Sequence, residues 1–161
     1  MNLQHLFKMQ KELDDFIEKT QNINRNVFKE KGLALMVELA ELANETRCFK
    51  FWSTKGPSER DVILEEYVDS IHFILSLGLL QGYTAIEKWP VIEEKRDLTE
   101  TFLITQDYIL KFISQPTEDS YLAIWQCYGL LAYNLGFTFE DVVGAYIEKN
   151  EENYNRQRSG Y

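Results

Sequence analysis

Two pairs of carboxylates in helix-forming stretches are the residues of this chain best suited to chemistry. Glu38 and Glu41 form the first pair, and Glu66 and Asp69 form the second. In each pair the acids are three residues apart, which places both side chains on one face of a helix. Like charges held this close repel, so a pair among apolar residues needs a compensating cation. Two such pairs predict an all-oxygen site for hard divalent metal ions such as Mg²⁺, which suits phosphate chemistry.

A purely structural role is the alternative for these acids. Glutamate favours helices, and most pairs of this spacing face water. The second pair is harder to explain in that way, because no charged residue occurs between Asp69 and Glu87. A carboxylate in such a stretch must be paired, protonated or bound to metal. Ser70 and His72 are near enough in sequence to bond to Asp69, which leaves both interpretations open.

The last expected helix changes character along its inner face. Its apolar stripe runs from Phe139 to Ile147 and then continues into amides at Asn150 and Asn153. Amides offer paired donors and acceptors that suit a base edge or a sugar hydroxyl, and basic side chains suit phosphates. A solvated terminus is the alternative for this polar segment. The basic residues nearby are Lys149, Arg156 and Arg158.

Helix signals fill the chain, and no convincing strand pattern occurs. Ser58, Thr117 and Thr138 are the expected N-caps, while Gly82 and Gly136 are the expected helix ends. Residues 83–97 are less regular. We therefore expect an all-α fold, a single-domain bundle of about six helices over residues 1–161. The expected helices cover residues 3–21, 27–49, 58–80, 98–114, 117–134 and 138–155.

The composition narrows the range of partners. The chain has 161 residues and a formal net charge of −9, which disfavours nucleic acid and anionic membranes as partners. Its longest apolar run, residues 71–80, is too short to span a bilayer. The N-terminal residues lack the core of a signal peptide, and Cys48 and Cys127 show no metal-ligand spacing. We expect a cytoplasmic protein.

Three blocks of the sequence resemble the all-α dimeric dUTPases, which are relatives of the MazG-type nucleotide pyrophosphohydrolases. The first block contains Glu38 and Glu41 and ends with Cys-Phe-Lys-Phe-Trp at residues 48–52. The second covers residues 65–73, and the third closes the chain with Lys-Asn-x-x-Asn-x-x-Arg-Gln-x-x-Gly-Tyr. Residues 83–114 carry no matching motif. The resemblance implies a MazG-like fold, a homodimer, and hydrolysis of dUTP to dUMP and pyrophosphate.

The resemblance also implies roles for individual residues. Glu38, Glu41, Glu66 and Asp69 match the family's metal-binding acids, which would hold Mg²⁺, or alternatively Mn²⁺, against the phosphates and an attacking water. One acid of the first pair would orient that water, and the sequence does not say which one. Glu65 competes with Glu66, since it shares a helix face with Asp69. The matches to substrate-binding positions are Trp52 and His72 near the base, Asn150 and Asn153 near the nucleoside, Lys149 and Arg156 near the phosphates, and, as weaker base-reading matches, Gln10 and Asp14.

Other functions remain open from the sequence. One is a MazG-like pyrophosphohydrolase of another nucleotide, such as dCTP. A different class is a non-catalytic helical binding protein. A di-metal redox bundle fits less well, because such bundles usually carry two Glu-x-x-His motifs and the nearest match here is Asp69-x-x-His72.

Overall fold

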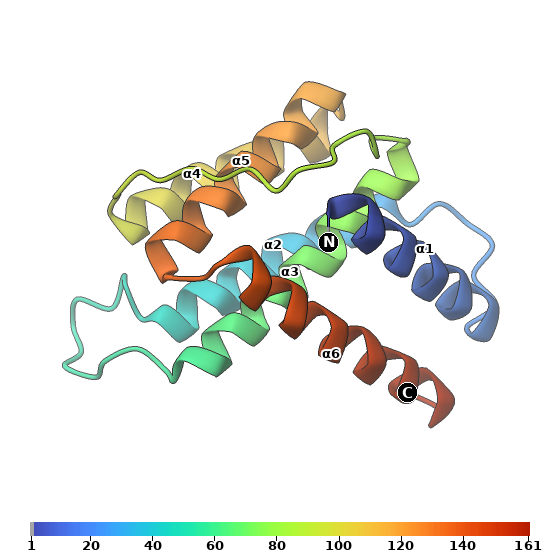
Figure 1. The fold of residues 1–161 in the computed structure, drawn as a ribbon, viewed down its shortest axis with the longest axis horizontal. Coiled ribbons are helices and arrows are strands. Elements are labelled where there is room, and N and C mark those ends of the chain that lie inside the picture. The colour runs from blue at the N-terminus through green and yellow to red at the C-terminus, as the bar shows by residue number, and fades with distance from the viewer. Residues whose placement is uncertain (1) are drawn as a thin grey trace.

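Six helices and their connecting loops make up residues 2–161, the part of the chain that the computed structural model describes. No strand occurs within that range, so the predicted all-α fold is confirmed. Residues 82–97 form a long non-helical connection that runs along α5, where the Asn134 side chain bonds to the backbone of Glu94 and Arg96 (Figure 1). The helices are α1 (Leu3–Thr20), α2 (Phe28–Thr46), α3 (Arg60–Gln81), α4 (Leu98–Ser114), α5 (Glu118–Leu135) and α6 (Phe139–Arg158).

Local capping explains most of the helix ends. Thr117 and Thr138 each form a capping box, at the start of α5 and of α6. Gly82 and Gly136 end α3 and α5 in the left-handed backbone region, with φ of 75° and 77°. Glycine adopts this conformation without the steric cost of a side chain. These four predicted ends are confirmed.

Two predicted ends between α2 and α3 are wrong. Arg47 turns into the left-handed region with φ of 58°, so α2 ends at Thr46 and not near residue 49. Ser58 does not cap α3, which begins at Arg60 with Glu59 in the cap position. The Ser58 hydroxyl instead donates to the Glu45 carboxylate, and its backbone N–H donates to the Glu45 carbonyl at 3.0 Å. A contact between distant residues has outcompeted the local cap.

The central helix of the fold is α3, which packs against α1, α2, α5 and α6 (Figure 1). Its side chains Tyr67, Ile71, Ile74 and Leu75 are fully buried. Burial of each such side chain stabilises the fold by roughly 1.5–3 kcal/mol. A polar residue on the buried faces of α3 must find a polar partner or line a cavity.

The first and last helices, α1 and α6, lie together on one side of the molecule. The α4–α5 hairpin lies on one side of α3, and α1 and α6 lie on the other (Figure 1). The far end of α1 meets the far end of α6, where the Gln21 amide donates to Gln157 at 2.8 Å and to the Tyr161 carbonyl at 3.1 Å. None of the helices in residues 2–161 combines the length and apolar character that crossing a bilayer requires.

Candidate active site

One pocket of about 370 Å³ is lined by side chains from α1, α2, α3 and α6. A volume of this size accommodates a small organic ligand. On α1, α2 and α3 the polar lining residues fall at intervals of three, four or seven, which keeps them on one face of each helix. Apolar side chains such as Leu13 and Phe73 complete the walls. The polar lining from these helices comprises Gln10, Asp14 and Glu18 of α1, Lys31 and Glu38 of α2, Asp69, His72 and Ser76 of α3, and Asn153, Arg156 and Gln157 of α6.

Three of the predicted acids come together at this pocket. Glu38 of α2 and Glu66 and Asp69 of α3 each offer an oxygen, and these oxygens all lie within 4.8 Å of one another. One oxygen of Glu38 and one of Glu66 are buried and have no hydrogen-bond partner among the described residues. Burying an unpaired carboxylate oxygen is costly, and an all-oxygen donor set is the one that hard divalent cations prefer. The residues present therefore fit a divalent metal ion.

Burial and the closeness of the acids raise their pKa values. Burial raises the pKa of the Glu38 carboxyl to about 8, with further contributions from Glu41 and Asp69. Burial also raises the pKa of Glu66 to about 7, followed by the charges of Asp69 and Glu41. A cation among these groups acts in the opposite direction, because it favours their charged forms. Metal binding at neutral pH must therefore displace protons from the cluster.

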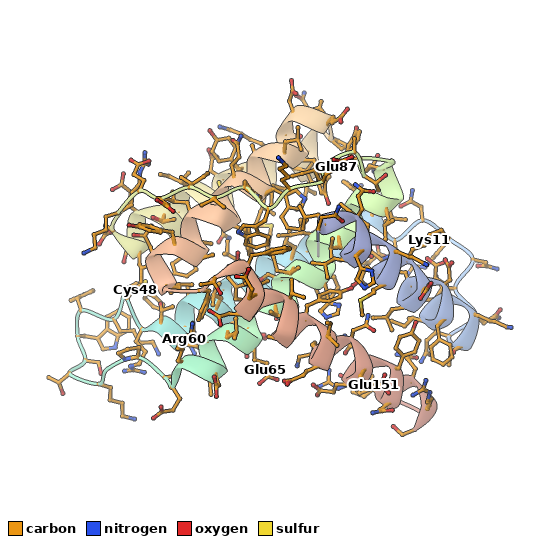
Figure 2. The ribbon with its side chains drawn as sticks, viewed as in Figure 1. Lys11, Cys48, Arg60, Glu65, Glu87 and Glu151 are labelled. Carbon is orange, nitrogen blue, oxygen red and sulfur yellow. The ribbon has the colours of Figure 1, made fainter. Side chains whose placement is uncertain are left out.

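Asp69 is partly compensated by a buried lysine of α6. Burial raises the pKa of Asp69, and the opposing influence comes from Lys149, whose Nζ lies 3.3 Å from its Oδ1. Lys149 also pairs with Glu65 at 2.7 Å and with Glu152 at 3.2 Å. Burial alone would lower the pKa of Lys149, but these ion pairs raise it above the usual value, so the side chain stays charged. Glu65 lies on α3 on the side facing α6 (Figure 2).

Of the neighbouring acids Glu65 and Glu66, only Glu66 belongs to the cluster of three acids, and Glu41 lies outside that cluster. Glu66 belongs to the cluster of three acids, whereas the Glu65 carboxylate bonds to Lys149. Glu66 and Asp69 therefore meet, and their predicted role as a pair of metal ligands stays a prediction. Glu41 is exposed and is not one of the three acids that meet. Glu41 follows Glu38 by one turn of α2, and its carboxylate raises the pKa of both Glu38 and Glu66, so it borders the cluster.

The pocket also holds a hydrogen-bonded group of side chains around His72, which lies one turn from Asp69 on α3. His72 is 5% exposed, its ring stacks on Tyr146 at 4.3 Å, and its Nδ1 lies 2.7 Å from the Gln10 Oε1 atom. Burial, and after it the charge of Lys149, lowers the pKa of His72 to about 3, so the ring is uncharged at neutral pH. Gln10 in turn bonds to Asp14 at 2.8 Å. Sequence matching had assigned Gln10, Asp14 and His72 to the base, and all three line one pocket.

The predicted residues of α6 divide into two groups. Asn153 and Arg156 line the pocket. Arg156 bonds to Glu152 at 2.7 Å, and its guanidinium lies 5.3 Å from the centre of the Tyr161 ring. Asn150 and Lys149 are buried and are not among the pocket-lining residues, and the side-chain nitrogen of Asn150 has no hydrogen-bond partner in residues 2–161.

Trp52 does not line the pocket. It is 65% exposed on the α2–α3 loop and packs edge-on against Phe49 and Phe51. Its predicted contact with a base therefore has no support from the geometry of a single chain.

Lys31 and Ser76 are among the pocket residues that sequence reasoning missed. Ser76 follows Asp69 by seven residues and Lys31 precedes Glu38 by seven, so each shares a helix face with one of the predicted acids. Extending the acidic stripe by two turns along each helix would have identified both. They were missed because a serine in an apolar run and a lysine on a helix are common without function.

An all-α fold with an oxygen-only acid cluster at the edge of a ligand-sized pocket defines a metal-dependent hydrolase of phosphate compounds. The sequence model of the dUTPase family matches residues 2–161, and the chain belongs to this family. Among curated proteins, none matches the sequence significantly. The chain is thus an enzyme, a dUTP diphosphatase that cleaves a nucleotide diphosphate bond and requires a divalent metal ion. This excludes the non-catalytic binding protein.

Proposed function

We propose that dUTP binds in the pocket between α1, α2, α3 and α6, where it is hydrolysed to dUMP and pyrophosphate. The observation that carries the proposal is the meeting of Glu38, Glu66 and Asp69, of which Glu38 and Asp69 line this pocket. The phosphates would lie beside these acids, and the base would lie beside Gln10 and His72. This placement of the substrate fits the chemistry of the pocket. A triphosphate needs a cation, which the acids can bind, and a base needs a dry surface with hydrogen-bonding groups.

We assign the metal site to Glu38, Glu41, Glu66 and Asp69. Mg²⁺ is the proposed ion and Mn²⁺ the alternative, since both accept carboxylate oxygens. Bound there, such an ion would offset phosphate charge and acidify a coordinated water. We assign to Glu41 the task of orienting the attacking water, because it borders the cluster and its carboxylate is exposed.

The remaining chain residues position the substrate. Arg156 is the proposed phosphate cation, since its guanidinium lines the pocket and is already oriented by Glu152 and Tyr161. Asn153 beside it would bond to the sugar. Lys149 supports the acid cluster, because it neutralises part of the charge on Asp69. A direct contact of Lys149 or Asn150 with the substrate would require α6 to shift.

A hydrolysis screen tests this proposal. The common nucleoside triphosphates, dUTP and dCTP among them, are incubated with the protein in Mg²⁺, in Mn²⁺ and in EDTA, and pyrophosphate is measured. We expect the highest kcat/KM for dUTP and no release in EDTA. A higher value for dCTP would instead establish the alternative substrate, and metal-independent release would remove the acid cluster from the mechanism.

We also propose a homodimer. Four large apolar side chains are exposed on α2 and α4, two helices that pack side by side. A second copy of the chain is the partner that the family resemblance implies, and burial of these side chains would favour association. They are Leu33 at 63% exposure and Val37 at 48% on α2, and Leu103 at 68% and Leu110 at 51% on α4.

A cytoplasmic location is likewise a proposal. It is supported by the two cysteines, since Cys48 and Cys127 are both free thiols. Free thiols are typical of proteins in a reducing compartment.

A further inference from the structure

A continuous chain of hydrogen bonds runs along the pocket from a lysine to a histidine. Lys31 Nζ lies 2.6 Å from Ser76 Oγ, and Ser76 Oγ lies 2.6 Å from Asp14 Oδ2. The other oxygen of Asp14 lies 2.8 Å from Gln10 Nε2, and Gln10 Oε1 lies 2.7 Å from His72 Nδ1. All five residues line the pocket. Gln10, Ser76 and His72 are at most 5% exposed, so water hardly competes for these bonds.

The donor and acceptor capacities of these five side chains determine the direction of every hydrogen bond that links them. A lysine ammonium only donates, so Ser76 accepts from Lys31 and gives its own proton to Asp14. A carboxylate only accepts, so Gln10 must turn its NH₂ group toward Asp14 and its carbonyl oxygen toward His72. Lys31 also lies 3.7 Å from Asp14, which balances the charge of the carboxylate.

The last link determines the tautomer of His72. Gln10 Oε1 already accepts from the Tyr146 hydroxyl at 2.8 Å, and as a carbonyl oxygen it can only accept from His72 as well. Nδ1 of His72 must therefore carry the hydrogen. Because the ring is uncharged, Nε2 is left with a lone pair. Nε2 is buried and has no hydrogen-bond partner among residues 2–161, so it is an acceptor without a donor.

We propose that Lys31 and Ser76 are positioning residues that hold His72 as an acceptor for the imide N–H of uracil. This inference rests on the proposed substrate pocket. Uracil carries a hydrogen on N3, whereas N3 of cytosine is itself an acceptor and would face the lone pair of His72. A site that offers an acceptor rejects a ligand lacking the donor, because both polar groups then stay unpaired.

The tautomer can be measured directly on the wild-type protein. The chain has only two histidines, so a ¹⁵N-histidine-labelled sample gives two imidazoles, and the variant His5→Gln identifies that of His72. We expect His72 to be neutral at pH 7, with the proton on Nδ1. The Nε2 resonance should move when α,β-imido-dUTP binds with Mg²⁺ and should stay nearly unchanged with α,β-imido-dCTP. A proton on Nε2, or a charged ring, would overturn the proposal.

Two variants with matched controls test the positioning role. Ser76→Ala removes the hydrogen bond that holds Asp14 Oδ2, so Asp14 can turn away from Gln10. The Gln10 amide is then free to rotate, which would move the histidine proton to Nε2. We expect the ratio of kcat/KM for dUTP to that for dCTP to fall at least tenfold, mainly through KM. Ser70→Ala is the control, because Ser70 is equally buried on α3 and does not line the pocket. Ser76→Thr keeps the hydroxyl and should keep the ratio.

Lys31→Met should have the same effect as Ser76→Ala, with Lys29→Met, an exposed lysine on the same helix, as its control. If both variants keep the wild-type tautomer and the wild-type ratio, the proposal is wrong. If Ser76→Ala fails to fold, the Lys31→Met variant and the spectrum of the wild-type protein still test the proposal. If the wild-type enzyme hydrolyses no dUTP, the proposed function fails, while the tautomer, read on the nucleotide-free protein, separately decides the role of the hydrogen-bond chain.

Discussion

At the scale of single residues, the acids of the pocket differ from the other acids of the chain in their surroundings. Most of the 26 acidic residues face water, where a carboxylate is cheap to keep charged. Glu38, Glu66 and Asp69 are partly buried and close together, and burial raises the pKa of each one. Such shifts are typical of functional sites, although ion-pair networks also cause them. Three predictions at this scale test whether the acids serve a metal.

The first concerns Asp69. Asp69→Asn should reduce turnover of dUTP at least about a hundredfold while the protein stays folded, because one charged metal ligand is lost. The stability of the metal-free protein should change little, since relief of the repulsion with Glu38 is offset by loss of the Lys149 ion pair. Pyrophosphate release and circular dichroism measure the two effects. Near-normal turnover in a folded variant would remove Asp69 from the site.

The second compares neighbours on α3. Glu66→Gln should abolish activity and weaken Mg²⁺ binding measured by calorimetry, because Glu66 belongs to the acid cluster. Glu65→Gln is the matched control and should be mild, because Glu65 bonds to Lys149 instead. The opposite ranking would move the metal-binding face by about 100° around α3, the angle between successive residues of a helix.

The third concerns pH. In the folded protein Glu38 and Glu66 have pKa values of about 8 and about 7, against 4.5 ordinarily. A raised pKa means that the folded state holds its protons longer than the unfolded state. The stability from these two carboxyls is full below 4.5 and is lost as the pH rises through 7 and 8.

Metal-free protein in EDTA should therefore melt at a lower temperature at pH 8.5 than at pH 5.5. Excess Mg²⁺ should reverse the difference, because the ion favours the charged acids. The double variant Glu38→Gln, Glu66→Gln should show a flatter dependence. A metal-free Tm that rises over this interval, or a wild-type slope that survives in the double variant, would show that these two acids do not control the pH dependence.

At the scale of elements, α6 connects the acid cluster to the outer end of the pocket. Its buried Lys149 supports Asp69, and its last turns carry Arg156, Gln157 and the chain end at Tyr161, all three of which line the pocket. This end is tied to α1 by the hydrogen bonds of Gln21 and by the contact between the Phe16 and Tyr154 rings. Segments held by few buried apolar contacts open at low free-energy cost, which makes this end of α6 suited to closing over a ligand.

Deleting residues 155–161 tests that role. The truncation removes Arg156 and the Tyr161 ring from the pocket, so we expect a higher KM for dUTP or a lower kcat. The Tm should fall only slightly, since few buried apolar side chains are lost. Gln21→Ala, which releases the same end without removing it, should give a smaller change in the same direction. A truncated enzyme with wild-type kinetics would make the segment a solvated terminus.

Elements also show how far the sequence could predict this molecule. Helix ends set by local signals, such as the Thr117 and Thr138 caps, were predictable because each depends on a few neighbouring residues. The start of α3 was not, because Ser58 bonds to Glu45 on another helix. The acid pairs were predictable from spacing alone, but the engagement of Lys149 with Glu65 depends on how α6 packs against α3. Contacts between helices are invisible to periodicity.

At the scale of the whole molecule, the net charge of −9 and the exposed apolar side chains of α2 and α4 act in opposite directions. Charge keeps copies of the chain apart at long range, and salt screens that repulsion. Buried apolar area acts at contact and does not need salt. If the homodimer forms through these helices, it should survive in dilute buffer as well as in salt.

Leu103→Glu and Val37→Glu test the proposed dimer face. Leu103 is 68% and Val37 48% exposed in the single chain, so neither change should disturb the fold of one copy, whereas each places a charge in the proposed interface. Sedimentation should show a wild-type dimer and monomeric variants, and the Tm of the wild type alone should rise with protein concentration. Val91→Glu is the control, because Val91 is 72% exposed on the 82–97 connection, outside the face. A wild-type monomer at working concentration, or a dimer that both variants leave intact, would mean that the apolar side chains of α2 and α4 are not the interface.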